Sequence, residues 1–202
     1  MITLLGEPPL EIEGVIQSAR PLWVLSHPHP LYGGSMHNKI IDQLFVRAVD
    51  RGVSVLRYNF RGVGQSAGKF DNGRGECDDL LRVITHVVED FEVLLQDIHL
   101  IGYSFGSYVS ALVAQRFTDL FKLSLIAPPT QWKVFPDLKC SFPVEIYMPC
   151  KDEYTQWSHA KAYFNTIDGP KTWIDIDHAN HFFVGTTKKM MDVFLQKQNL
   201  VQ

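Results

Sequence analysis

Residues 98–114 read IHLIGYSFGSYVSALVA, and this stretch decides the fold. The apolar run 98–101 predicts a short buried strand that ends directly at Gly102. A helix-forming segment begins at Ser107, so GYSFG (102–106) is expected to form a sharp turn between the two. A serine in such a turn has its hydroxyl lifted clear of the backbone, at the N-terminus of a helix. The pattern therefore marks Ser104 as a candidate nucleophile, the alternative being a helix-capping serine without chemistry.

A second stretch, GQSAG (64–68), has the same G-x-S-x-G pattern. Its context differs, because the preceding strand is expected to end near Tyr58 and the following KFDNGRG is rich in turn residues, without helical periodicity. We therefore interpret GQSAG as a glycine-rich surface loop and Ser66 as a turn or capping serine.

Strand-like and helix-like segments alternate along the rest of the chain. This alternation predicts an α/β fold with a mostly parallel central sheet and helices on both faces. In such sheets the reactive groups lie on loops beyond the carboxyl ends of the strands. The length of 202 residues suits a single domain over 1–202. Strands are expected at 12–17, 22–26, 53–58, 98–101, 120–126, 144–148 and 172–176, and helices at 36–49, 80–88, 107–117, 156–164 and 186–198.

Composition narrows the classes of function. The formal net charge of -3 offers no broad basic field, so a nucleic-acid partner is not expected. The three cysteines, Cys77, Cys140 and Cys150, have no C-x-x-C spacing, which favours a reducing compartment over a disulfide framework or a zinc site. The first residues lack a positively charged signal region, and no run approaches 18 apolar residues. We therefore expect a cytoplasmic protein without membrane association.

A nucleophilic serine needs a histidine as base and a carboxylate that orients this histidine. The loop after the strand VEIYM contains Asp152 and Glu153, and the loop after TWIDI contains His178 and His181. His181 is the favoured base, because it directly precedes two phenylalanines and the closing helix, whereas His178 reads as a solvent-facing loop residue. From the residues alone, either carboxylate could be the acid.

A reaction through an oxyanion also needs two backbone N–H donors. One is expected from Phe105, directly after the candidate nucleophile. The other should come from HPHPLYGG (27–34), whose prolines carry no N–H, which leaves His29 or Leu31, with His29 favoured. A metal site at the H-P-H pair is weakly supported without further ligands nearby, so no metal is expected.

With these residues in place, the chain resembles the α/β-hydrolase superfamily, and within it a group of small bacterial-type hydrolases without a cap domain. The resemblance extends from about residue 20 onward. It is carried by HPHPLYGGSMHNKI (27–40), LRYNFRGVGQSAG (56–68), GYSFGSYVSALVA (102–114), PCKDE (149–153) and ANHFF (179–183).

The resemblance implies a Ser104–Asp152–His181 triad that cleaves ester, thioester or related acyl bonds of a small-molecule substrate through an acyl-enzyme, without a cofactor. It also interprets residues 59–68 as the structural D-x-R-G-x-G-x-S-x-G loop of the superfamily, with Asn59 in place of the aspartate. Two alternatives stay open, a catalytically silent protein that binds a small ligand and a dienelactone-hydrolase-like enzyme.

The segment 128–140 is too short for a folded cap, so an open site is expected. Nothing in the sequence determines the oligomeric state. Aromatic residues near the expected site are candidates for the lining of an apolar acyl slot. They are Tyr32, Trp132 and Phe182, together with Phe135 and Phe183.

Overall fold

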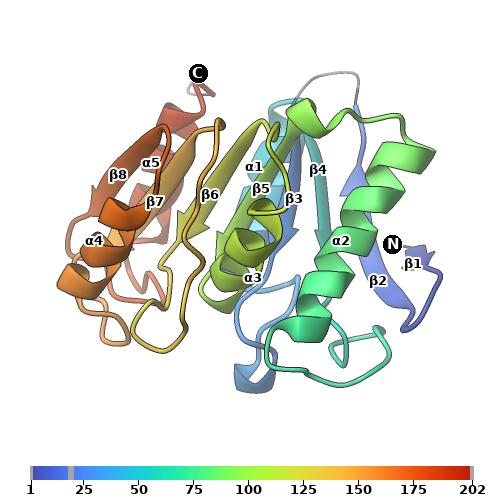
Figure 1. Cartoon of the computed structure of the whole chain (residues 1–202), viewed down its shortest axis with the longest axis horizontal. Coiled ribbons are helices and arrows are strands. Elements are labelled where there is room, and N and C mark those ends of the chain that lie inside the picture. The colour runs from blue at the N-terminus through green and yellow to red at the C-terminus, as the bar shows by residue number, and fades with distance from the viewer. Residues whose placement is uncertain (1, 18–20, 201–202) are drawn as a thin grey trace.

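A computed structural model describes residues 2–17 and 21–200, and its eight strands form one sheet in the order β1-β2-β4-β3-β5-β6-β7-β8 (Figure 1). The strands are β1 (Ile2–Leu4), β2 (Leu10–Val15), β3 (Leu22–Ser26), β4 (Ser54–Tyr58), β5 (Ile98–Tyr103), β6 (Lys122–Ile126), β7 (Val144–Pro149) and β8 (Lys171–Ile176). From β4 to β8 every neighbouring pair is parallel, whereas β1 and β2 are antiparallel to their neighbours. The predicted mostly parallel sheet is confirmed, and the first expected strand lies at 10–15 rather than 12–17.

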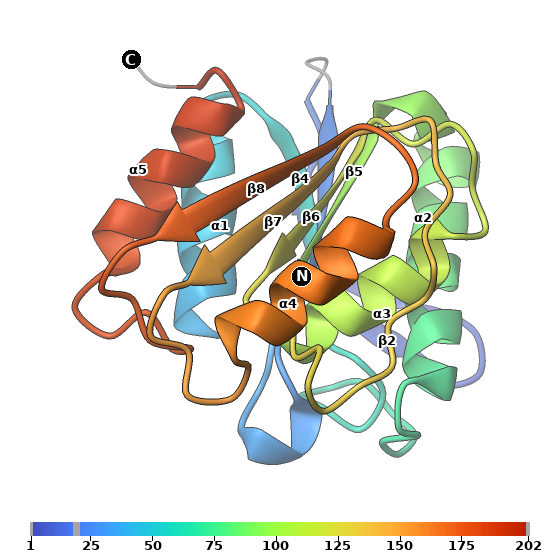
Figure 2. The same ribbon diagram turned by 60° about the vertical axis from the view of Figure 1, so that its left-hand side comes forward.

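Helices cover both faces of the sheet, as predicted (Figure 2). One face carries α1 (Lys39–Asp50) and α5 (Thr187–Lys197), and the other carries α2 (Arg74–Asp90), α3 (Phe105–Ala114) and α4 (Trp157–Thr166). The short 3-10 helices η1 (Pro30–Tyr32) and η2 (Leu95–Asp97) lie in connections. Among these described helices, none is long and apolar enough to cross a membrane.

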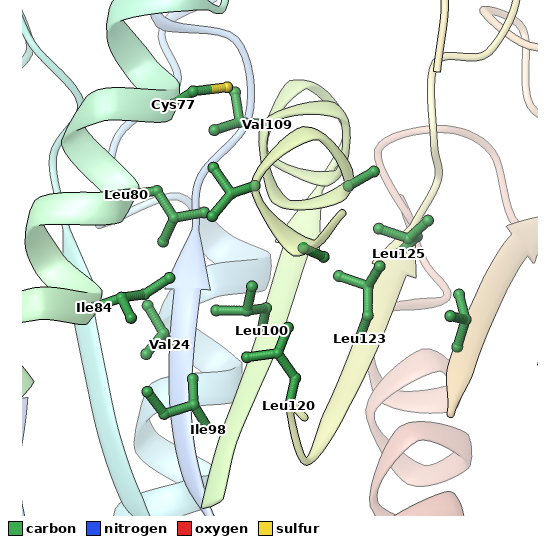
Figure 3. Close-up of a cluster of buried hydrophobic side chains, with 14 of the residues drawn as sticks. Val24, Cys77, Leu80, Ile84, Ile98, Leu100, Val109, Leu120, Leu123 and Leu125 are labelled. Atoms are coloured by element: carbon green, nitrogen blue, oxygen red, sulfur yellow. The ribbon is translucent and has the colours of Figure 1, made fainter. Parts of the chain in front are cut away.

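The core on the α2 and α3 side is built from the apolar stripes of these helices against β3, β5 and β6 (Figure 3). Leu80 and Ile84 come from α2, four residues apart on one face, and Leu100 comes from β5. All three are fully or almost fully buried. This packing fixes α3 directly over the strand that leads into the GYSFG turn.

Helix α2 begins at Arg74, six residues before the predicted start. Its first turn is held by the buried Glu76 carboxylate, which accepts the N–H groups of Asp71 at 2.8 Å and Gly73 at 2.7 Å. The residues of this first turn are stabilised by polar capping and show no helical spacing of apolar residues. The hydrophobic pattern therefore predicts a helix that begins later.

The connection from β6 to β7 contains no helix, and its only ladder contact is an isolated bridge between Lys139 and Asp168. The expectation that the fold lacks a cap domain is therefore confirmed. Among the described residues, loops rather than a folded cap therefore surround the carboxyl ends of the parallel strands.

Candidate active site

Ser104 occupies the sharp turn between β5 and α3, with φ 53° and ψ -118°. The two glycines of the pattern make this turn possible. A Cβ on Gly102 would lie 2.3 Å from the carbonyl oxygen of Gly106, and a Cβ on Gly106 would lie 2.1 Å from the carbonyl oxygen of Ser26. The turn therefore brings the backbone of α3 directly against the end of β3.

The structure brings the three predicted catalytic side chains together at the ends of β5, β7 and β8. Ser104 Oγ lies 2.9 Å from His181 Nε2, and His181 Nδ1 lies 2.8 Å from Asp152 Oδ2. Because the carboxylate only accepts, Nδ1–H donates to Asp152, which leaves Nε2 as the acceptor of the Ser104 hydroxyl. The side chains of His181 and Asp152 are 6% and 0% exposed, so this series is shielded from water.

The surrounding backbone holds the acid in place. Asp152 Oδ1 accepts the N–H groups of Tyr154 at 2.8 Å and Thr155 at 2.9 Å, so both carboxylate oxygens are engaged. These bonds hold the carboxylate in position beside the imidazole.

Glu153, the other candidate acid, has a different contact. Its Oε2 accepts the backbone N–H of His181 at 3.0 Å, and the Tyr103 hydroxyl donates to the carbonyl oxygen of His181 at 2.9 Å. The loop that carries His181 is thus tied to the neighbouring strand ends from both sides. His178, the other candidate base, lies exposed in the same loop with φ 63°.

Ser66 lies away from this series, in the loop that was expected to be a surface turn. The loop lies at the surface as predicted, with Gly64, Gln65, Ala67 and Gly68 exposed, whereas Ser66 itself is only 5% exposed. Its Oγ donates to the carbonyl oxygen of Asn59 at 2.7 Å and accepts the N–H of Glu11 at 2.9 Å. This hydroxyl therefore joins the loop to β2 through Glu11 and to the residue after β4 through Asn59.

His27 fixes the loop that follows β3. Its Nε2 accepts the N–H of Phe60 at 3.1 Å, so Nδ1 carries the proton and donates to the carbonyl oxygen of Pro28 at 2.6 Å. Burial lowers the pKa of His27 to about 3, and the ring is neutral at physiological pH. Neither nitrogen is free for a metal, so His27 acts as a structural bridge in the H-P-H pair.

The two candidates for the second oxyanion donor differ in their hydrogen bonds. The Leu31 N–H donates to His29 Nδ1 at 3.2 Å. The N–H groups of His29 and Phe105 donate to none of the described residues, and both residues line the same cavity as Ser104. The geometry therefore favours His29 over Leu31 as the partner of Phe105.

A cavity of about 430 Å³ opens beside Ser104 and His181, and its walls are mainly aromatic. Tyr32, Trp132 and Phe182 all line it, and the first two are 87% and 69% exposed at its rim. Phe183 is not a lining residue, because it packs in the hydrophobic core on the α1 and α5 side of the sheet. Phe135 is not one either, and its ring packs against that of Tyr163.

Sequence reasoning missed several residues of this wall, among them Tyr154 and Lys133. Tyr154 places its ring 4.9 Å from that of His181, and Lys133 is a charged residue in a largely apolar lining. Tyr154 could have been found from its position two residues after Asp152. No local pattern marks Lys133.

Residues 24–165 match the model of a protein family described as serine aminopeptidase, S33. The chain belongs to this family. This α/β hydrolase is also 32% identical, over 81% of its length and 72% of the relative's, to an uncharacterized protein of Rickettsia prowazekii.

Two solved structures are similar to this α/β hydrolase over nearly their whole lengths. An α/β serine hydrolase homologue from Coxiella burnetii has 32% identity and a TM-score of 0.88, with 97% of this chain and 95% of that chain covered. A serine hydrolase without lid from Xanthomonas campestris has 29% identity and a TM-score of 0.88, with 96% and 91% covered. The described lack of a lid agrees with the helix-free β6–β7 connection of this α/β hydrolase.

Proposed function

We propose that this α/β hydrolase cleaves ester or thioester bonds of small acyl compounds, with Ser104 as nucleophile, His181 as base and Asp152 as the orienting acid. The observation that carries the proposal is the continuous hydrogen-bonded series from Ser104 through His181 to Asp152, with Ser104 in a strained turn at the cavity wall. Backbone strain of this kind persists only where the surroundings enforce it.

Acylation begins when Ser104 Oγ attacks the carbonyl carbon of the substrate and its proton passes to His181 Nε2. Asp152 stabilises the resulting imidazolium. The oxyanion of the tetrahedral intermediate accepts hydrogen bonds from the free N–H groups of Phe105 and His29. The intermediate then collapses, the C–O or C–S bond to the leaving group breaks, and the leaving group takes the proton from Nε2.

Deacylation repeats these steps with water as the nucleophile. His181 Nε2 accepts a proton from water, the hydroxide oxygen attacks the acyl carbon, and a second oxyanion forms against the same two N–H groups. Collapse breaks the ester bond to Ser104 Oγ, which takes back the proton. The products are a carboxylic acid and the free enzyme.

The size and openness of the cavity support small or mid-length acyl groups, or acyl groups exposed on larger carriers. A volume of about 430 Å³ without a cap gives a long alkyl chain little cover from water. The aromatic rim of Tyr32, Trp132 and Phe182 can still enclose a short apolar chain.

We also propose a cytoplasmic location. All three cysteines are free thiols, which suits a reducing compartment. Immunodetection of the native protein in the cytosolic fraction is the expected result, and its recovery in a secreted or membrane fraction would contradict this location.

Labelling with a fluorophosphonate probe tests the nucleophile, in wild type, Ser104→Ala and Ser66→Ala, each checked for folding by circular dichroism. Labelling should disappear only in Ser104→Ala. Labelling that persists in Ser104→Ala and disappears in folded Ser66→Ala would assign the chemistry to the other serine. A folded wild type that is not labelled and hydrolyses no ester would favour a silent ligand-binding protein. A series of 4-nitrophenyl and thioester substrates then tests size, and faster hydrolysis of long-chain than of short-chain esters would contradict the proposed substrate class.

A further inference from the structure

Lys133 is the one charged lysine, arginine, aspartate or glutamate side chain among the residues that line the cavity beside Ser104. It is half-buried, which is uncommon for lysine, and the other lining residues are mainly aromatic or small. A positive charge in this partly open wall can attract an anionic group on a ligand.

Within the described part of the chain, the Lys133 ammonium makes neither an ion pair nor a hydrogen bond. Its Nζ lies 5.7 Å from the ring centroid of Phe105 and 5.3 Å from that of Tyr108, so the charge rests over aromatic faces. Two other lysines have an ion-pair partner, Lys122 with Glu145 and Lys188 with Asp192, whereas Lys161 also rests over aromatic rings.

The position of Lys133 relative to the catalytic residues is fixed by its turn. The N–H groups of Trp132 and Lys133 donate to the carbonyl oxygen of Pro129 at 3.0 and 3.1 Å. Trp132 Nε1 donates to the carbonyl oxygen of Tyr154 at 2.6 Å, which ties this turn to the loop that begins with Asp152. Lys133 is therefore held beside the reacting centre rather than carried on a free surface segment.

The nearby carboxylates do not neutralise this charge. Asp152 is engaged by His181 and two backbone N–H groups, and Glu153 by the His181 N–H. The charge of Lys133 also acts on the neighbouring His29 ring, because burial and this charge together lower the pKa of His29. The cavity wall thus carries a positive charge over the Phe105 ring, and no aspartate or glutamate is among its lining residues.

We infer that Lys133 is a specificity residue that binds an anionic group, a carboxylate or phosphate, on the substrate of the proposed hydrolase. This inference rests on the proposed function. A second cavity of about 350 Å³ shares Trp132 and Lys133 with the first. Lys133 therefore lines both cavities, so a substrate with its carbonyl at Ser104 can extend a charged end toward it. That end belongs either to the acyl group or to the leaving group.

Matched pairs of esters distinguish these two sources of the anion. The acyl arm compares 4-nitrophenyl hemiglutarate with 4-nitrophenyl pentanoate, and the leaving-group arm compares the acetyl esters of 4-hydroxybenzoate and of methyl 4-hydroxybenzoate. The readout is the ratio of kcat/KM for the anionic and the neutral ester, after subtraction of spontaneous hydrolysis. In one of the two arms, the wild-type ratio should be about 10, which is the factor expected from one charge-assisted contact.

Three variants assign this ratio to Lys133. Lys133→Met should reduce the ratio about 10-fold, and Lys133→Arg should retain most of it. Lys161→Met is the matched control, because Lys161 also rests over aromatic rings, Trp173 at 4.3 Å among them, yet lies outside both cavities. A wild-type ratio near 1 in both arms, or equal ratios in wild type and Lys133→Met, would overturn the inference.

A binding arm separates this inference from the proposed function. Pentanoate and pentanamide are titrated against Ser104→Ala and Ser104→Ala/Lys133→Met, with tryptophan fluorescence as the signal because Trp132 adjoins Lys133. Pentanoate should bind Ser104→Ala more tightly than pentanamide does, and this preference should be lost in Ser104→Ala/Lys133→Met. Such a result supports the anion site even if the wild type hydrolyses no ester. A lack of hydrolysis would then contradict only the hydrolase proposal. Normal hydrolysis without any preference for anions in kinetics or binding contradicts only the role of Lys133.

Discussion

The side-chain amide of Asn59 donates a hydrogen bond to the Glu11 carboxylate at 2.7 Å, and both residues are buried. The same carboxylate oxygen accepts the N–H of Gln65 at 2.7 Å, and Asn59 Oδ1 accepts the N–H of Met36 at 2.8 Å. An amide is the group that can donate on one side and accept on the other. The buried Glu11 carboxylate on β2 thus explains why this chain has Asn59 where the superfamily loop has an aspartate.

Asn59→Asp should be strongly destabilising, because it places two buried carboxylates in contact. We expect the free energy of unfolding in urea at neutral pH to fall by about 3 kcal/mol. Glu11→Gln in the same chain should restore much of this loss, since its amide can donate to the new carboxylate while its oxygen accepts from Gln65. A double variant no more stable than Asn59→Asp alone would show that the pair does not explain the departure.

Ser66→Ala should affect stability rather than chemistry. It leaves the buried N–H of Glu11 and a carbonyl of Asn59 without their partner, at a cost of about 1–3 kcal/mol. Thermal and urea unfolding measure this loss, and the fluorophosphonate labelling of Ser104 should persist. Ser104→Ala is the matched control, with a smaller expected loss because it removes a single contact to His181. Equal stability of Ser66→Ala and wild type would contradict the structural role of this serine.

Asp152→Asn should lower kcat by about 10³- to 10⁴-fold, because the amide no longer enforces the His181 tautomer that accepts from Ser104. Hydrolysis of a short 4-nitrophenyl ester measures this loss. A decrease of less than about tenfold would exclude Asp152 as the orienting acid.

Glu153 is a positioning residue, so its conservative variant should behave differently from a truncation. Glu153→Gln keeps an oxygen that can accept the His181 N–H, and kcat should change little. Glu153→Ala removes the acceptor and should lower kcat about tenfold, the scale expected for a misplaced catalytic group, while KM changes less. Equal losses in the two variants would point instead to the charge of Glu153, and a lack of effect in both would exclude the positioning role.

Stability should fall as the pH is lowered below about 7, partly through two buried neutral histidines. Burial lowers the pKa of His27 to about 3 and the pKa of His99 well below 6.5. In the unfolded chain these rings take up protons below about pH 6.5, whereas the folded protein does not, so acid favours unfolding. Each histidine contributes about 1.4 kcal/mol of lost stability between pH 7.5 and 5.5.

His99→Phe tests this contribution at a site remote from Ser104. Phenylalanine keeps the stacked contact of the His99 ring with Phe194, at 6.3 Å between centroids, but loses the bond between His99 Nε2 and Ser124 Oγ at 2.8 Å, so the two pH values are compared within each variant. Urea unfolding at pH 7.5 and 5.5 should show a difference about 1.4 kcal/mol smaller than in wild type. An unchanged difference would show that His99 is protonated in the folded protein.

The sequence could predict the features of this fold that depend on local pattern. The turn at Ser104 follows from a strand and a helix that adjoin it directly, and Asp152 and His181 follow from the rule that loops after parallel strands share one edge. The buried hydrogen bond of Ser66 could not be predicted from the sequence, because its partner Glu11 lies 55 residues away in the chain. Glu153 and Lys133 act through contacts with distant backbone and rings, and no spacing in the sequence encodes these.

Because Gly106 has no side chain, the backbone of α3 packs directly against the carbonyl oxygen of Ser26 at the end of β3. This backbone contact therefore fixes the position of Ser104 relative to the loop that contains His27 and His29. No side chain takes part in the contact. The residues proposed to contact a substrate stand on other segments, the β6–β7 connection and the loops after β7 and β8. Substitution of those residues should therefore leave the backbone contact between α3 and β3 unchanged.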